Sequence, residues 1–171
     1  KKGELLFDHL NIQLKEKVVI VGTNGSGKTT LLKAINGKQS INKGYIILEE
    51  DFIKRNGIQR RENVFIYIPK DYSNFFKELK VKHILAFMTK STNQTPVLEE
   101  GKINNNHRFK DLTYIQTLIL FIHVGIVNSH SIFLFDEPFL HLASREAAIF
   151  KRIYTTVFKD KAVILTANTA F

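Results

Sequence analysis

The sequence predicts an α/β fold built on a mainly parallel β-sheet. Short apolar runs alternate along the 171 residues with segments of helical character, an order typical of parallel sheets with crossover helices. A glycine-rich loop joins one of the first apolar runs to a helical segment. Apolar residues make up 44% of the chain, which is enough to bury a core and argues against a disordered chain.

The strands of the main sheet are expected at short runs of apolar and β-branched residues. One such run is bounded by Pro69, which cannot continue a central strand. Near the N-terminus, Glu4–Phe7 and Leu10–Leu14 predict a strand pair that would form an antiparallel β edge. The expected strands of the main sheet are Lys17–Val21, Tyr45–Leu48, Val64–Ile68, Ser131–Phe135 and Ala162–Thr166.

Helices are expected in the segments between these strands. The first ends at Gly37, and the last is expected to have Ser144 as its N-cap and Glu146 in its first turn. The polar segment Lys90–Phe109 is expected to be a loop or a weakly ordered linker. The expected helices are Thr29–Asn36, Lys80–Met88, Thr113–Val127 and Ser144–Phe158.

The loop after Lys17–Val21 matches the phosphate-binding pattern G-x-x-x-x-G-K-[ST]. Its glycines let several backbone N–H groups point at one anion, and the helix behind adds the positive end of its dipole. Lys28 would reach the β- and γ-phosphates of a nucleotide, and the Thr29 hydroxyl would hold Mg²⁺. A glycine turn beside a lysine is the alternative, but strand, loop and helix together favour the nucleotide site. The predicted nucleotide-binding residues are Gly22, Asn24, Gly25, Ser26, Gly27, Lys28, Thr29 and Thr30.

An acidic motif follows the apolar run Ser131–Phe135. Asp136 and Glu137 lie at the carboxyl end of this expected strand, where ligands bind in parallel sheets. Asp136 is predicted to hold Mg²⁺, directly or through water, and Glu137 to orient or deprotonate an attacking water. A solvated strand end would carry similar residues. Downstream of a phosphate loop, however, the motif predicts the second half of a nucleotide site.

Gly22–Thr30 together with Phe133–Pro138 resembles the ATPase domain of ABC (ATP-binding cassette) proteins. The resemblance implies a P-loop NTPase fold of ABC type, with a parallel sheet core, an N-terminal antiparallel β edge and a reduced helical subdomain. In this family two domains pack head to tail, and ATP lies between the phosphate loop of one and the "L-S-G-G-Q" motif of the other. The further matching segments are Leu5–Leu14, Lys43–Ile46, Ile66–Pro69 and Val81–Leu85.

The segment that matches the "L-S-G-G-Q" motif is degenerate. Thr113 keeps a hydroxyl and Gln116 matches, but Tyr114 and Ile115 replace both glycines. Because only small residues let the backbone come close to a phosphate, these two should spoil the half-site that this chain would offer a partner.

Four further positions depart from the family pattern. Lys70 stands at the glutamine-loop position, where it cannot ligate Mg²⁺ but could pair with a phosphate or a carboxylate. Ala143 replaces the aspartate expected after the acidic motif, and Ala167 replaces the switch histidine. His141 lies nearby but out of register, and is interpreted as a loop histidine. Lys2 stands where the adenine-stacking aromatic residue should be.

The expected organisation is one ABC-type domain over residues 1–171. Residues 1–69 and 128–171 would form its catalytic core, and residues 70–127 a helical insert. The family's N- and C-terminal elements are expected to be missing, and the chain, which begins at Lys1, is suspected to be a fragment or a processed form.

The composition excludes several other kinds of site. Cysteine is absent, so disulfides and cysteine metal sites are excluded, and the six histidines show no metal-ligand spacing. The longest apolar run, Leu118–Val127, is far shorter than a membrane span. The net charge of +9 leaves membrane proximity open, but no aromatic-plus-basic motif for nucleic acid stands out.

The expected function is that of an ATP-binding subunit or domain of an ABC transporter, with ATP and Mg²⁺ as cofactors. It would pair with a second ABC ATPase domain and an integral membrane subunit at the cytoplasmic face of a membrane, with slow or partner-dependent hydrolysis. The alternative is a non-transport ABC protein or a regulatory ATP-binding module, associated with the ribosome or nucleic acid. An unrelated P-loop kinase is disfavoured, because so long an insert precedes Asp136 and Glu137.

Overall fold

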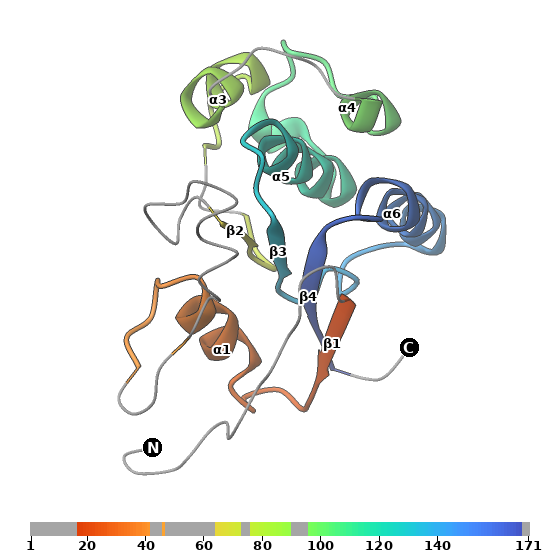
Figure 1. The fold of residues 1–171 in the computed structure, drawn as a ribbon. Helices are drawn as coiled ribbons and strands as arrows, with labels where there is room; N and C mark the ends of the chain where they lie inside the picture. Colours follow the sequence, from red (N-terminus) through yellow and green to blue (C-terminus); the bar gives the residue numbers. More distant parts are fainter. Residues whose placement is uncertain (1–16, 42–45, 47–63, 73–75, 90–95, 169–171) are drawn as a thin grey trace.

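The computed structural model describes residues 17–41, 46, 64–72, 76–89 and 96–168 (Figure 1). The expected N-terminal strand pair, Glu4–Phe7 and Leu10–Leu14, lies outside these residues. So does the expected strand Tyr45–Leu48, apart from Ile46.

The described strands form one parallel sheet, which confirms the predicted fold class. Its order is β1-β4-β3-β2, and every neighbouring pair is parallel, with Val18 opposite Ile164 and Phe133 opposite Val163. All six residues of the β4 strand are buried, as expected for a central strand covered on both faces. The strands are β1 (Lys17–Val21), β2 (Phe65–Ile68), β3 (Ile132–Phe135) and β4 (Ala162–Ala167).

Helices cover both faces of this sheet, because successive strand residues point to opposite sides. Leu134 and Ile164 pack with Leu32 and other residues of helix α1 on one face. On the other face, Phe133 and Val163 belong to a larger apolar cluster that includes residues of α3, α4, α5 and α6. The helices are α1 (Lys28–Ile35), α3 (Val81–Met88), α4 (Pro96–Glu100), α5 (Tyr114–Val127) and α6 (Ser144–Val157), with a 3₁₀ turn, η2, at Phe109–Asp111.

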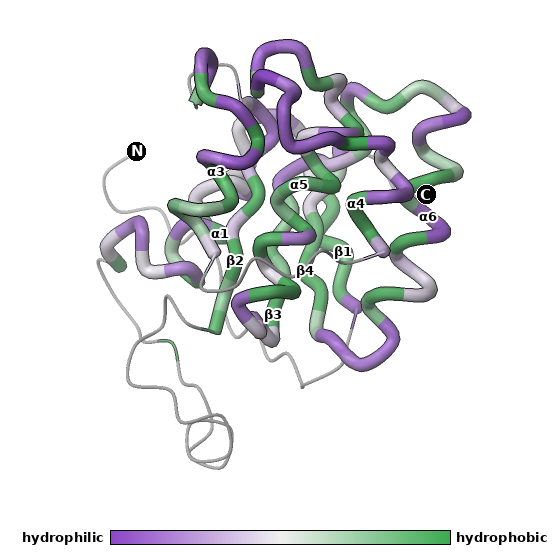
Figure 2. The backbone as a smooth tube through the Cα atoms, turned by 90° about the horizontal axis from the view of Figure 1, so that it is seen from above, coloured by the Kyte–Doolittle hydropathy of each residue, from purple (hydrophilic) through white to green (hydrophobic). Residues whose placement is uncertain are grey.

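Helix α5 forms the centre of the larger cluster. Leu118, Ile119 and Ile122 have no exposed surface, and His123 is only 2% exposed. Burial holds the pKa of His123 below its ordinary value, so this histidine is neutral at physiological pH and belongs to the core. Figure 2 shows that hydrophobic segments gather in the interior, at α5, β3 and β4.

In the part of the chain that the structure describes, no helix has both the length and the apolar character that a membrane crossing requires.

Two expectations for the helices were wrong. Part of the expected loop Lys90–Phe109 is the short helix α4, which starts at Pro96 and buries Val97 and Leu98 in the cluster around α5. The N-cap of α6 is Ala143 rather than Ser144, because the backbone N–H of Ala143 donates to the Glu146 carboxylate at 3.0 Å. For α4, the sequence signals were Pro96 at the first position and the apolar residues Val97 and Leu98. The otherwise polar composition of Lys90–Phe109 masked these signals.

Candidate functional site

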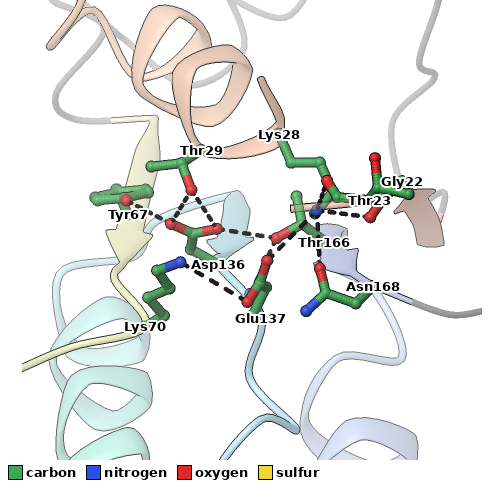
Figure 3. A network of polar contacts seen from close by, with 10 residues as sticks. All are labelled: Gly22, Thr23, Lys28, Thr29, Tyr67, Lys70, Asp136, Glu137, Thr166 and Asn168. Carbon is green, nitrogen blue, oxygen red and sulfur yellow. Dashed lines mark hydrogen bonds and ion pairs between the residues drawn. The ribbon is translucent and has the colours of Figure 1, made fainter. Parts of the chain in front are cut away.

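The candidate site lies at the carboxyl ends of three neighbouring strands and at the start of α1 (Figure 3). Gly22 follows β1, Asp136 and Glu137 follow β3, and Thr166 lies near the end of β4. Parallel strands end at the same edge of a sheet, so segments far apart in the sequence supply one set of polar groups there.

The predicted phosphate loop connects β1 to α1 in a strained, glycine-dependent path. Gly25 and Gly27 have φ angles of 81° and 93°, which disfavour any residue with a side chain. A Cβ atom at Gly22 would lie 2.7 Å from the Ser26 hydroxyl oxygen. The side chains of Asn24, Ser26 and Thr30 are exposed along this rim. The loop therefore presents backbone N–H groups next to the N-terminus of a helix, which is the arrangement that binds phosphate.

Lys28 is buried beneath the loop and surrounded by oxygen atoms. Its ammonium donates to the carbonyl oxygens of Gly22 at 2.7 Å and Thr23 at 3.0 Å, and to Asn168 Oδ1 at 3.0 Å. It also lies 3.4 Å from Glu137 Oε1, and the residue is only 5% exposed. The charge of Lys28 is thus fixed at the base of the loop, where phosphate oxygens would replace part of its present partners.

Asp136 accepts hydrogen bonds from the hydroxyl groups of three other elements. Thr29 Oγ1 donates to both carboxylate oxygens at 2.8 and 3.0 Å, Tyr67 OH donates at 3.1 Å and Thr166 Oγ1 at 3.0 Å. The residue is 1% exposed, so these bonds replace water around a buried carboxylate. Burial and the neighbouring carboxylate raise the pKa of Tyr67 well above its ordinary value, which keeps its hydroxyl a donor.

Glu137 lies between two ammonium groups. Its Oε1 is 3.4 Å from Lys28 Nζ and its Oε2 is 3.8 Å from Lys70 Nζ. Its backbone has a φ of 49°, a left-handed conformation that is uncommon for a residue with a side chain, and its N–H donates to Thr166 Oγ1 at 2.9 Å. The sequence allowed Lys70 to pair with either a phosphate or a carboxylate. In the structure it lies beside the carboxylate of Glu137.

The donor set fits Mg²⁺ and a phosphate chain. Thr29 Oγ1 and the Asp136 carboxylate are hard oxygen ligands, the kind that Mg²⁺ prefers, and they already lie side by side at 2.8 Å. Among the described residues there is no cluster of three or more histidine or acidic side chains that would suggest a transition-metal centre instead.

The residues at the predicted signature position, Thr113–Gln116, make contacts within this chain and away from the phosphate loop. Thr113 Oγ1 accepts from the Gln116 backbone N–H at 3.4 Å, and Gln116 Oε1 accepts from the Thr113 backbone N–H at 2.9 Å. Together they form a capping box that starts α5. Ile115 is 6% exposed in the core, and the Tyr114 ring packs against His141 with centroids 5.2 Å apart. The four side chains thus have structural roles within this chain.

Three residues in the site carry no signal in the known motifs. Tyr67 lies inside strand β2, and Thr166 inside β4, where each is one residue of an apolar run. Asn168 follows Ala167, the position at which the sequence comparison expected a switch histidine, and its amide oxygen contacts Lys28. The one sequence signal available for Asn168 was a polar residue placed directly after an apolar strand, at the edge where ligands bind.

The fold and this site define a P-loop nucleotide-binding protein. The family model described as "ABC transporter" matches residues 8–140, so the chain belongs to the ABC transporter family. ATP binding, typically with Mg²⁺, is the shared property that this membership implies.

Two relatives illustrate the range of the similarity. The chain is 26% identical over 182 residues to the cytochrome c biogenesis ATP-binding export protein CcmA of Reclinomonas americana, a match that covers 98% of this chain and 80% of CcmA. It is 31% identical over 142 residues to the ATP-binding protein Uup of Buchnera aphidicola, covering 77% of this chain but 22% of Uup. The chain therefore spans most of the length of CcmA but less than a quarter of the length of Uup.

Solved structures support the fold. An ABC transporter ATP-binding protein from Pyrococcus furiosus superposes with a TM-score of 0.77 and 17% identity, over 100% of this chain and 88% of that one. A dimeric ATP-binding cassette bound to ADP and phosphate superposes with a TM-score of 0.70 and 21% identity, over 94% of this chain and 78% of that one.

Proposed function

We propose that this chain is the ATP-binding subunit or domain of an ABC transporter, and that it binds Mg-ATP at the edge formed by Lys28, Thr29 and Asp136. The observation that carries the proposal is the convergence of a buried lysine, a hydroxyl and a carboxylate beside a helix N-terminus. Membership of the ABC transporter family supports the same reading.

Each residue of the site has a distinct part in binding. The loop N–H groups and Lys28 would hold the β- and γ-phosphates, while Thr29 and Asp136 would hold Mg²⁺. The bound ion would neutralise phosphate charge. Tyr67 and Thr166 would keep the Asp136 carboxylate in one orientation, because each donates a hydrogen bond to it.

Hydrolysis would be slow or dependent on a partner. Glu137 is the candidate general base, but it is paired with Lys28 and Lys70 and must leave one or both to reach an attacking water. The replaced glycines at Tyr114 and Ile115 remove the close backbone approach that a second domain would need. A partner domain with an intact signature motif would complete the site formed by this phosphate loop.

Coupling to transport follows from the same proposal. Nucleotide-driven closure onto a second ATPase domain would move an integral membrane subunit, with this chain at the cytoplasmic face of the membrane. The similarity to CcmA, whose name describes an export protein, and the coverage of 80% of that relative support this reading.

A non-transport role is the second candidate. The net charge of +9 and the similarity to Uup, named only as an ATP-binding protein, favour it.

Isolation of the tagged protein from its native cells separates the two candidates. Recovery with an integral membrane protein in detergent, together with ATP turnover that falls when Glu137 is changed to Gln, would support the transporter. Recovery with ribosomes, or a salt-sensitive mobility shift with RNA, in the absence of membrane protein, would support the non-transport role. Unchanged turnover in E137Q, with ATP still bound, would show that the partner performs the chemistry.

A further inference from the structure

Asn168 is the residue of the site whose chemistry the proposed function has not used. It follows β4, the strand that lies between β1 and β3, so it emerges at the sheet edge between the phosphate loop and the acidic motif. Its side chain is exposed, whereas Lys28, which it contacts, is buried. A neutral amide therefore stands where a ligand can reach it, directly beside the charge at the base of the loop.

The contact with Lys28 fixes the direction in which the amide of Asn168 faces. The Lys28 ammonium donates to Asn168 Oδ1 at 3.0 Å. An ammonium group has donors only, so the oxygen of the amide must face it and the nitrogen must face away. Asn168 Nδ2 makes no hydrogen bond with the residues that the structure describes. Two N–H donors are thus available beside a lysine whose proposed ligand is a phosphate chain.

The partners of Lys28 indicate which phosphate these donors would meet. The carbonyl groups of Gly22 and Thr23 contact the ammonium from the phosphate loop. Glu137 and Asn168 approach it from the ends of β3 and β4, as Figure 3 shows. Glu137 is the candidate base for the water that attacks the terminal phosphate. The terminal phosphate of ATP is therefore expected on the side of Lys28 that Asn168 shares with Glu137.

We propose that Asn168 is a specificity-determining residue that lets this site distinguish ATP from ADP. Its Nδ2 donates to an oxygen of the γ-phosphate, while its Oδ1 stays on the Lys28 ammonium. ADP has no γ-phosphate, so this charge-assisted hydrogen bond is made with ATP alone. The inference rests on the proposed function and deepens it, because it assigns discrimination between the two nucleotides to this chain without a partner domain.

The affinities of Mg-ATP and Mg-ADP, measured calorimetrically with the full chain and with Asn168→Ala, test this assignment. Truncation also removes Oδ1 from Lys28, which should affect both nucleotides alike, because the lysine contacts phosphate in each. The ratio of the two affinities therefore isolates the contact with the γ-phosphate. We expect Asn168→Ala to lower the ATP-to-ADP affinity ratio about tenfold, the effect of losing one hydrogen bond to a charged group.

Asn168→Asp is a second, nearly isosteric variant. It keeps an oxygen acceptor toward Lys28 but replaces the donor group with a second anionic oxygen. The ATP-to-ADP affinity ratio should fall further than in Asn168→Ala, because a carboxylate repels the γ-phosphate. Asn106→Ala is the matched control, since Asn106 is exposed in the turn before η2 and has no described contact with the site. It should leave both affinities unchanged.

The outcomes separate this inference from the proposed function. If the unaltered chain binds neither nucleotide, the proposed function and this inference both fail. If both nucleotides bind and the ATP-to-ADP affinity ratio is unchanged in Asn168→Ala, the inference alone is overturned. A ratio in Asn168→Asp equal to that of the unaltered chain would also overturn it. Because Asn168 is exposed, both variants should melt at the temperature of the unaltered chain.

Discussion

The two adjacent carboxylates of the site are held in different ways, although they follow the same strand. Asp136 accepts bonds from neutral hydroxyl groups on three elements, whereas Glu137 faces two ammonium groups. Neutral donors orient a carboxylate without cancelling its charge, so Asp136 remains available to a cation. Glu137 is held by charge, and its partners must change before it can act on water.

Thr166 connects the two carboxylates, because its hydroxyl donates to Asp136 and accepts from the Glu137 backbone N–H. Thr166→Val keeps the shape of this fully buried residue, but it leaves the Glu137 backbone N–H without its acceptor and removes one donor to Asp136. We expect a loss of about 1–3 kcal/mol in the free energy of unfolding, measured by urea denaturation. Thr155→Val, an exposed change on α6, should alter it by less than about 0.5 kcal/mol. Equal stability of Thr166→Val and the unaltered chain would contradict the network.

Lys70 is the second residue whose role can be isolated. Lys70→Gln removes the ammonium beside Glu137 and restores the side chain that the ABC pattern has at this position. ATP turnover by the complex purified with its partners should rise roughly threefold or more, since Glu137 is then released toward water. Lys77→Gln, at an exposed lysine without a described contact to Glu137, is the control and should leave turnover unchanged. A fall in turnover in Lys70→Gln would mean that the lysine assists the reaction.

Among the elements, α5 combines two tasks. Its first turn is fixed by Thr113 and Gln116, two residues of the predicted signature position, and Gln116 also donates to the Gly101 carbonyl at 3.0 Å. Its middle turns fill the core against the sheet. These contacts give Thr113 and Gln116 a structural role at the start of the helix, independent of any partner domain.

Close packing of α5 against β3 depends on Gly125. A Cβ atom there would lie 2.5 Å from the Phe133 ring and 3.0 Å from an Ile66 methyl group. Gly125→Ala should therefore destabilise the protein by about 1–3 kcal/mol, despite the better helix propensity of alanine, because the core must move to admit a methyl group. Thermal and urea unfolding would measure this loss. If Gly125→Ala proves more stable than the unaltered chain, the described spacing of α5 and β3 is incorrect.

The elements of the core were predictable where local signals and tertiary packing agree. Short apolar runs located β1, β2, β3 and β4, and a longer apolar run located α5. Helix α4 was missed because it is five residues long and gains its stability from burying Val97 and Leu98 rather than from its own sequence. The cap of α6 was misplaced by one residue because a glutamate side chain bonds the Ala143 backbone, so a conventional N-cap residue was not needed.

For the whole molecule, the order β1-β4-β3-β2 decides which residues meet. This order places β4 between the strands that carry the phosphate loop and the acidic motif, so Thr166 and Asn168 enter the site beside Lys28 and Asp136. The motifs predicted Lys28, Thr29 and Asp136 as neighbours. The participation of Tyr67 and Thr166 was not predictable, because it depends on strand order and on the register between strands, which no local pattern encodes.

Equilibrium binding of Mg-ATP to the purified chain and to Lys28→Ala tests the proposed nucleotide site. We expect Lys28→Ala to weaken binding about 100-fold or more, since at least two charge-assisted contacts to phosphate are lost. Lys33→Ala, an exposed change one turn further along α1, should bind as the unaltered chain does. Equal affinity of Lys28→Ala and the unaltered chain, with both folded, would show that this loop is not where the nucleotide binds.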